Sequence, residues 1–378
     1  MNALLTMKEG SKQHRTYLVI TWGLFVLLAI ALPYILTAMF GEFQVSRMNR
    51  ALFMAVAILG LNLVIGYSGL IALGHSAFIG IGAFVTTTLV QDHNWDYWMT
   101  IPASMLACFF VGVLLGIPAL RIKGLYLALV TVTFAVVFPT LAKIDKWTIS
   151  DRTGGVNGRR IDEKVAAPTW VQNILGIDDT PDQQVIYRYF IIAILTAITF
   201  ALVRNLIKSR PGRAIVAIRD NETGAAVSGI NLPLYKVMTF GVSASFGGLA
   251  GMMWAMDRAF VAEQDFTFVL AIDLLVGLVI GGVATLQGGL AGALVVVFVR
   301  EWTKGLEIPL GFTTIDGGGP LSQAIFGVIL IFVTFFAPGG LVSAFRLVKN
   351  KLVRVIPQPP EGVTPFARAA DAVEEAVV

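Results

Sequence analysis

Apolar residues are gathered in ten long runs along the chain, separated by polar stretches. The runs lie at about residues 17–40, 51–66, 70–90, 99–119, 125–142, 186–206, 233–257, 268–286, 288–303 and 321–338. At about 1.5 Å per helical residue, most of these runs are long enough to cross a hydrocarbon core of about 30 Å. The pattern predicts an all-α fold, a polytopic membrane helical bundle with about ten transmembrane helices. The second and third runs have an alternative interpretation, as one span followed by a broken or re-entrant piece.

Composition supports a membrane protein. The 378 residues are 56% hydrophobic and 14% charged, whereas about a quarter of the residues in a soluble domain are charged. The first run continues from Tyr17 to about Phe40, which is longer than the apolar core of about 7–15 residues in a signal peptide. We therefore interpret the first run as a transmembrane span.

The distribution of Lys and Arg predicts the orientation. Ten spans put both termini on one side, and that side holds about 16 of the 28 Lys and Arg residues, an excess typical of the cytoplasmic face. The opposite side has the short loop 91–98, which contains no Lys or Arg, and a long loop at 143–184. This outer loop is either a solvated connector or a platform for an external partner, because loops of that length are often functional.

Three segments follow from this topology. Residues 1–16 form a cytoplasmic N-terminal segment, and residues 17–341 form the transmembrane domain. Residues 342–378 combine an amphipathic helix, with apolar and cationic residues at helical spacing, and a disordered cytoplasmic tail rich in Pro and Glu.

The most informative loop is the basic one at 204–232, on the cytoplasmic side. Ile215 and Ile218 fall on one face of a short helix, with Arg213 and Arg219 away from it. Asn221 suits the start of a second short helix. Two such helices can dock in the groove of a soluble partner. The alternative is an ordinary basic loop that obeys the positive-inside rule.

Glycine-rich stretches mark two further places. GYSGLIALGHSAFIGIGAF (66–84) is either pathway lining with unwound backbone or a closely packed helix. The pairs Gly277/Gly281 and Gly288/Gly292 predict helix–helix packing. The tetrapeptide LVIG occurs at 63–66 and at 278–281, each time before a glycine-rich segment, which is compatible with an internal repeat.

Two titratable residues fall inside apolar runs. His75 is either a buried neutral side chain bonded to a neighbouring carbonyl or a proton relay. Asp273 is either a functional carboxylate of the pathway or a hydrogen-bonded structural one near the outer face. We interpret Arg300 and Glu301, which lie at the end of a span, as interfacial anchors.

Motifs of enzymes and of nucleic-acid binding are absent from the sequence. It has no GxxxxGK[ST] phosphate loop, no HExxH and no GxSxG. Cys108 is the only cysteine, so the chain forms no internal disulfide and no cysteine-based metal site. No basic stripe with interleaved aromatic residues accompanies the net charge of +4, which argues against a nucleic-acid partner. If ATP drives the protein, the motor is another polypeptide.

Five stretches together resemble a known family. They are GYSGLIALGHSAFIGIGAF (66–84), RIKGLYLALVTVTFA (121–135), TGGVNG (153–158), GRAIVAIRDNETGAAVSGIN (212–231) and FFAPGGL (335–341). In order and spacing they are similar to the LivM-like permeases of bacterial branched-chain amino acid ABC importers, from about residue 45 to 345.

The resemblance implies a type II-like ABC importer permease in the bacterial plasma (inner) membrane, surrounded by lipid. Its partners would be a second, H-type permease, two cytoplasmic ATPases and an extracytoplasmic solute-binding protein. The chain itself would hold no cofactor, since the ATPases bind ATP and Mg. The implied ATPase-coupling residues are Gly212, Arg213, Ala214, Ile218, Arg219, Asn221, Glu222, Ala225 and Gly229. Candidate residues of the translocation pathway are Gly69, Gly74, His75 and Asp273.

We therefore expect a transport subunit, not an enzyme, for branched-chain, hydrophobic amino acids. An importer of urea or short amides has the same architecture and is the first alternative. An ion-coupled secondary transporter is the second, and it would depend on His75 or Asp273. Because the spans offer small and apolar walls, substrate selectivity is expected mainly in the binding protein.

Overall fold

The computed structural model of the chain describes the helices, most short connections and three small strand pairs. The described residues are 5–8, 12–41, 43–120, 125–143, 158–161, 183–258, 260–304, 307–309, 314–316 and 339–356, with single positions between 165 and 180 and between 325 and 335. Outside them lie residues 121–124, most of the loop 143–184, most of the predicted run 321–338 and the tail from 357. The chain divides into two units, Pro33–Ser343 and the combination of Met1–Leu32 with Ala344–Val378.

The smaller unit joins the two ends of the chain. Strand β1 (Leu5–Lys8) pairs in parallel with β6 (Val353–Ile356), with Leu5 opposite Val353. Helix α1 (Lys12–Phe40) begins in this unit, and helix α15 (Gly340–Leu352) leads into β6. The expected amphipathic helix is therefore present up to Leu352. The β-branched residues that follow it are extended, as their propensity favours.

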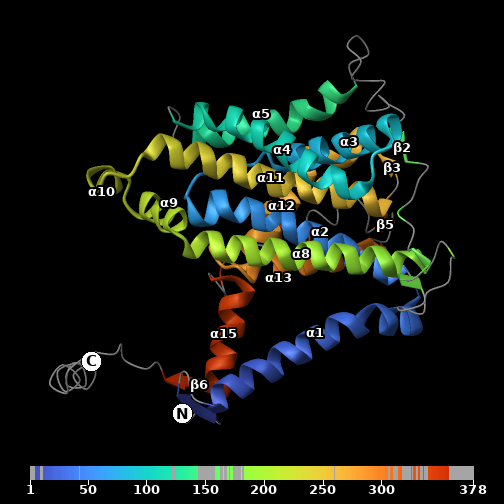
Figure 1. The fold of residues 1–378 in the computed structure, drawn as a ribbon, viewed down its shortest axis with the longest axis horizontal. Coiled ribbons are helices and arrows are strands. Elements are labelled where there is room, and N and C mark those ends of the chain that lie inside the picture. Colours follow the sequence, from blue (N-terminus) through green and yellow to red (C-terminus); the bar gives the residue numbers. More distant parts are fainter. Residues whose placement is uncertain are drawn as a thin grey trace. The chain divides into compact units, whose positions relative to one another are not determined.

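The larger unit is a bundle of helices (Figure 1). Its elements are α2 (Phe43–Asn62), η1 (Leu63–Tyr67, a π-helical turn), α3 (His75–His93), α4 (Tyr97–Gly116), η2 (Pro118–Leu120), α5 (Leu125–Ala142), α8 (Gln184–Lys208), α9 (Arg210–Asp220), α10 (Glu222–Val227), α11 (Leu232–Arg258), η4 (Glu263–Phe266), α12 (Phe268–Gly281) and α13 (Gly288–Lys304). Two antiparallel strand pairs join β2 (Arg159–Arg160) to β3 (Phe260–Val261) and β4 (Glu307–Pro309) to β5 (Thr314–Asp316).

The lengths of the helices confirm a polytopic helical membrane protein. Among the described residues, four helical segments are long and apolar enough to cross a bilayer, Phe43–Tyr67, Tyr97–Gly116, Gln184–Lys208 and Leu232–Arg258. Shorter apolar helices lie at Leu27–Phe40, Tyr126–Ala142 and Phe268–Gly281. Each predicted run from 17–40 to 288–303 contains a helix, whereas the tenth run falls mainly outside the described residues.

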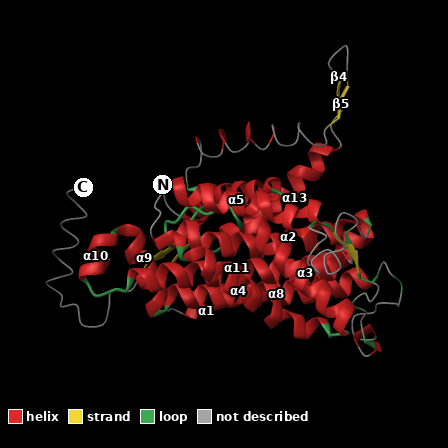
Figure 2. Cartoon of the chain, turned by 90° about the horizontal axis from the view of Figure 1, so that it is seen from above, coloured by secondary structure: helices red, strands yellow, loops and turns green. Residues whose placement is uncertain are grey.

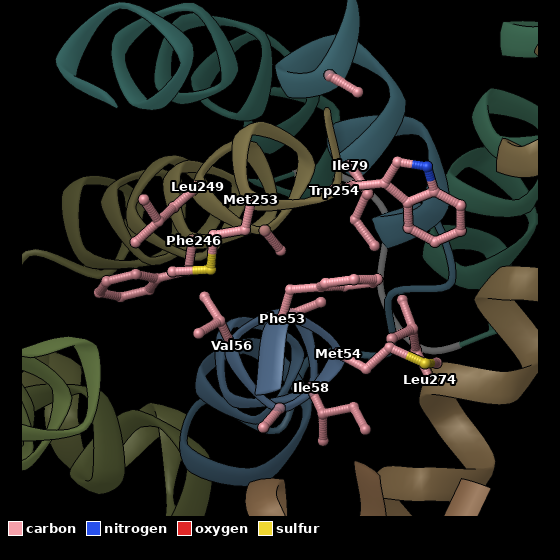
Figure 3. Close-up of a cluster of buried hydrophobic side chains, with 14 of the residues drawn as sticks. Phe53, Met54, Val56, Ile58, Ile79, Phe246, Leu249, Met253, Trp254 and Leu274 are labelled. Carbon is pink, nitrogen blue, oxygen red and sulfur yellow. The ribbon is translucent and has the colours of Figure 1, made fainter. Parts of the chain in front are cut away.

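Helix α11 is the centre of the bundle, where it packs against α2, α3 and α4. Figure 3 shows large side chains of α2 facing those of α11, with Ile79 and Leu274 beside them. Because lipid is as apolar as these side chains, close van der Waals packing stabilises the contact more than water exclusion does. The packed side chains are Phe53, Met54, Val56 and Ile58 on α2 and Phe246, Leu249, Met253 and Trp254 on α11.

Glycines allow the closest approaches between helices. A Cβ atom at Gly292 would overlap the backbone of Gly277, and one at Gly281 would overlap that of Gly288. The sequence prediction that these four glycines form a helix–helix seam is thus confirmed, with α12 and α13 as the two partners.

The helix breaks differ from the predicted spans. Helix α2 continues into the π-helical turn η1, residues 68–74 are not helical, and α3 begins only at His75. The first part of the run predicted at 70–90 is therefore not helical, which agrees with the alternative interpretation of one span followed by a broken piece. Likewise, the predicted span 268–286 is too long, because α12 ends at Gly281 and Gly282 has a φ of +117°, which a residue with a side chain rarely adopts.

Both views show helices α9 and α10 beyond one end of α4 and α11 (Figure 1, Figure 2). We call this the α9 end of the bundle. The strand pair β2–β3 and the last turn of α11 belong to the opposite end, which we call the far end (Figure 1).

Candidate functional site

The coupling segment (residues 204–232) opens with a sharp turn between α8 and α9. The Ser209 hydroxyl donates to Leu206 O at 2.6 Å and accepts from Gly212 N at 3.4 Å, so Ser209 is the N-cap of α9. Pro211 lies in the first turn of α9, where its missing N–H is no loss. A side chain at Gly212 would overlap the end of α8, which explains why a glycine is needed there.

Helix α9 has the two faces that the sequence predicts. Ile215 and Ile218 are buried against α8, η1 and α11, whereas Arg213 and Arg219 are on the exposed side and Ala214 lies at the boundary. The side chain of Ile218 therefore anchors α9 to its own bundle and is not presented to a partner.

Helix α10 is held by caps and by an ion pair. Asn221 Oδ1 accepts from Gly224 N at 2.9 Å, which confirms the predicted N-cap. Glu222 Oε1 lies 2.6 Å from Nζ of Lys236, a buried residue in the second turn of α11. Ala225 is buried and its carbonyl accepts from Ile230 N at 3.1 Å, while Gly229 has a φ of +80°, the left-handed conformation that ends many helices.

The outward face of α10 is small and apolar. Val227 is 86% exposed, the highest exposure of any large apolar side chain that the structure describes. The residues around it are small or short, and the exposed cations Arg210 and Arg213 lie on the neighbouring helix. A rigid, capped helix pair with one protruding apolar side chain and basic neighbours has the chemistry of a docking surface for a soluble protein.

The pathway candidates Gly69 and Gly74 lie in the non-helical segment 68–74. Gly69 is exposed with a φ of +70°, and a Cβ there would lie 2.8 Å from Cγ of Arg219. Gly74 is buried against the backbone of Thr131, whose hydroxyl also accepts from Leu73 N at 2.9 Å. Non-helical backbone within a bundle needs such partners, because lipid offers none.

His75 connects three helices halfway along α11. Its Nε2 lies 2.8 Å from Ser243 Oγ, and Ser243 donates to Gly60 O at 2.5 Å. Because the single hydroxyl hydrogen goes to Gly60, Nε2 carries the proton and donates to Ser243. Nδ1 is buried and has no hydrogen-bond partner among the described residues, so a proton there would be unpaired, and His75 is a neutral, buried residue that bonds through Nε2. The sequence predicts a bond from His75 to a neighbouring carbonyl. The partner is instead the hydroxyl of Ser243, which in turn donates to the carbonyl of Gly60.

Asp273 lies at the far end in a group that we call the far-end ionic cluster (Arg47, Arg50, Asp273, Arg300 and Glu301). Arg300 Nη1 donates to Asp273 Oδ2 at 2.5 Å, and Glu301 pairs with Arg47 at 3.3 Å and with Arg50 at 3.9 Å. Both carboxylates thus have cationic partners from another helix, as buried carboxylates require. Asp273 is therefore the hydrogen-bonded structural carboxylate of the two alternatives. Arg300 and Glu301, which we interpreted as interfacial anchors, bond α13 to α12 and to α2.

The far end also holds a described part of the outer loop. Arg159 on β2 pairs with Asp92 at the end of α3, and the β2–β3 ladder attaches this part of the loop to the connection after α11. Asn49 Nδ2 donates to Asp257 Oδ1 at 2.8 Å close by. The Arg159–Asp92 pair and the β2–β3 ladder hold residues 159–160 of the loop on the bundle, and the Asn49–Asp257 bond joins α2 to α11 at the same end.

The residues named from the sequence do not form one site. The coupling residues lie together at the α9 end with Gly69, His75 lies midway, and Asp273 lies at the far end. Sequence reasoning also missed Asn62, whose buried amide binds the α12–α13 connection. An Asn between leucines in an apolar run was the available signal, since an unbonded amide there costs several kcal/mol (roughly 2–7).

Comparisons with known proteins agree with the family resemblance. The family described as "Branched-chain amino acid transport system / permease component" matches residues 44–334. The high-affinity branched-chain amino acid transport system permease protein LivM of Escherichia coli is 27% identical over 337 residues, covering 85% of this chain and 74% of LivM. LivM of Salmonella typhimurium has the same identity and coverage. The galactose/methyl galactoside import permease protein MglC of Escherichia coli is 27% identical, covering 82% of this chain and 91% of MglC. No solved structure matches the chain.

We predict that Asp273→Asn lowers stability and leaves the choice of substrate unchanged. The substitution removes the carboxylate from a cluster with three arginines, at a cost of roughly 1–3 kcal/mol, because the pair is not fully buried. The measurement is the thermal unfolding midpoint of the purified chain in detergent. The double variant Asp273→Asn/Arg300→Gln removes both charges and recovers most of the loss. A stable Asp273→Asn variant with a changed substrate preference would contradict the structural role.

Proposed function

Because the chain belongs to the family of branched-chain amino acid transport permease components, we propose that it is the translocation subunit of an ATP-driven importer for these amino acids. The observation that carries the ATP-driven part of the proposal is the coupling segment. It is a pair of short capped helices, fixed to the bundle by Ile215, Ile218 and Lys236, with an apolar tip and cations turned outward. The sequence has no phosphate loop, so an ATPase that drives the chain would be a separate protein docked at this surface.

The proposed assembly follows the architecture of ABC importers. It contains a second permease, two ATPases that bind ATP and Mg on the cytoplasmic side, and a solute-binding protein on the outer side. In this arrangement the chain lies in a bacterial inner membrane with its termini and the α9 end in the cytoplasm. The excess of Lys and Arg on that side supports the orientation.

The substrate class rests on the relatives. Both LivM proteins are branched-chain amino acid permeases by name and match 85% of this chain. A sugar is the second candidate, because the galactose permease MglC matches over most of both chains. The ion-coupled alternative has less support, since His75 and Asp273 are both engaged in bonds within the bundle. Urea stays a candidate that only transport can decide.

Uptake tests the substrate class. Cells that lack leucine uptake are supplied with the chain and its proposed partners, and entry of labelled leucine is measured with competitors. We expect unlabelled isoleucine and valine to compete, because an apolar side chain on a zwitterionic head is the shared feature. Galactose and urea serve as controls and are expected to have no effect. Competition by either of them, with none by valine, would reassign the substrate.

Val227 tests the docking surface. Val227→Ala removes two methyl groups from the protruding tip. At about 0.8 kcal/mol per buried group, this weakens ATPase binding by roughly tenfold. The measurement is the amount of ATPase that co-purifies with the chain. Val136→Ala, the same truncation at an exposed valine of α5, is the matched control and is expected to retain the ATPase. Equal retention by both variants would exclude the tip as a contact.

Cysteine labelling tests the orientation. Cys108 is the only cysteine and is buried, so a Cys108→Ala background carries Asp96→Cys or Thr223→Cys, both at exposed positions. An impermeant thiol reagent added to intact cells is expected to label the cysteine introduced at position 96 and to spare that at 223. After membrane permeabilisation both should react. Labelling at 223 in intact cells would reverse the topology and remove the coupling segment from the ATPase side.

A further inference from the structure

Arg219 belongs to the coupling segment by sequence, but its guanidinium is bonded to the bundle. Nη1 donates to Gly66 O at 2.9 Å, and Nε and Nη2 lie 2.9 and 2.8 Å from Asp220 Oδ1. The stem of the side chain lies over Gly69, where even a Cβ would be only 2.8 Å away from Cγ. The donors of Arg219 are therefore directed at its own chain.

Gly66 lies in η1, the π-helical turn that ends the α2 segment. The carbonyls of a helix end lack partners within the helix, and inside a bundle each must find another donor. Arg219 is such a donor, and a hydrogen bond from a charged group is stronger than a neutral one. Helix α9 is thus bonded directly to the end of the α2 segment.

One turn before Gly66, Asn62 holds the same segment from another side. It is fully buried, its Nδ2 donates to Thr285 O at 2.8 Å, and its Oδ1 accepts from Ala284 N at 2.9 Å. Ala284 has a φ of +57°, an unusual conformation for a residue with a side chain, which persists only where the surroundings fix it. Ala284 also lies close to Gly66, since a Cβ at Gly66 would be 2.6 Å from Ala284 N.

Residues 62–66 are therefore bonded on one side to α9 and on the other to the α12–α13 turn. Both copies of LVIG, at 63–66 and 278–281, lie beside this junction, and each ends a helix. The two helix breaks, 68–74 and 282–287, follow them directly. A displacement of α9 has a continuous hydrogen-bonded route to both breaks.

We propose that Arg219 is a positioning residue for transport, which joins α9 to the π-helical end of α2 and, through Asn62, to the α12–α13 turn. Movement of α9 then shifts both breaks together. This role rests on the proposed function, in which an ATPase moves the coupling segment. It differs from docking, because Arg219 transmits the movement within the chain and does not hold the ATPase.

The test uses the complete complex of permeases, ATPases and binding protein in proteoliposomes. Arg219→Met keeps the stem over Gly69 and removes every donor. Arg219→Lys keeps one donor for Gly66 O. Arg213→Met is the comparison variant, because it removes the same charge from the exposed docking face of the same helix, where Arg213 donates to Lys208 O and not to the helix breaks. Asn62→Leu removes the second half of the connection at similar volume.

For Arg219→Met we expect ATPase co-purification as in the wild type and uptake per ATP hydrolysed that falls by about tenfold, within the usual range of coupling between sites. Arg219→Lys recovers part of the loss, whereas Arg213→Met is expected to weaken ATPase co-purification and to leave uptake per ATP hydrolysed near the wild-type value. The double variant Arg219→Met/Asn62→Leu is no worse than the more severe single variant, because both act on one connection.

A second readout does not depend on transport. On ATP binding, hydrogen exchange in the wild-type complex is expected to change at the coupling segment and at residues 66–74 and 282–287. In Arg219→Met it should change at the coupling segment alone. The proposal would be overturned if ATP binding changed exchange at neither break in the wild-type complex, if it still changed exchange at both breaks in Arg219→Met, or if uptake per ATP in Arg219→Met equalled that of the wild type. Loss of the ATPase from Arg219→Met would make Arg219 a docking contact instead, with the proposed function intact. A wild-type chain that binds no ATPase would refute the proposed function itself.

Discussion

The buried amide of Asn62 supplies hydrogen bonds that the backbone of the bundle cannot make for itself. Where a helix ends among apolar side chains, the free N–H and C=O groups find no water, and each costs several kcal/mol unless it is bonded. Asn62 Nδ2 donates to Thr285 O and its Oδ1 accepts from Ala284 N, so the α12–α13 turn binds both ends of the amide. These two bonds allow the turn to lie against α2. The glycine seam between α12 and α13 begins directly beside the turn, where Gly281 meets Gly288.

Polar bonds of the same kind determine which helices are neighbours around α11. Apolar side chains alone discriminate poorly, because lipid satisfies them equally well. The chain from His75 through Ser243 to Gly60 fixes the relative heights of α3, α11 and α2. Cys108 donates to Phe78 O at 3.3 Å and does the same for α4 and α3. Between these points the glycines of α11 and its neighbours bring the backbones together, so the core is both bonded and packed.

The sequence predicts the elements whose signals are local. Apolar runs give the helices, Ile215 and Ile218 give the buried face of α9, and Asn221 and Gly229 give the ends of α10. The break before α3 is one of two interpretations, and the sequence cannot decide between them because residues 70–74 are as apolar as a helix. The bond from Leu73 N to Thr131 Oγ1, which supports the non-helical backbone there, is a tertiary contact. The partner of Asp273 is 27 residues away in the chain. Asn62 illustrates this limit of the sequence. An unbonded amide in an apolar run is costly, so the sequence indicates that Asn62 must have partners, but only the fold shows which groups they are.

The two ends of the bundle are built for different tasks. At the far end, ion pairs of Arg47 and Arg300 with carboxylates join α2, α12 and α13, and removing one partner of such a pair is costly. At the α9 end, by contrast, the helices are already interrupted at 68–74 and 282–287. The segment through which ATP energy would enter is bonded to these breaks through Arg219. Under the proposed function, rearrangement would therefore start beside the coupling segment, and the ion-paired far end would be the part against which the helices move.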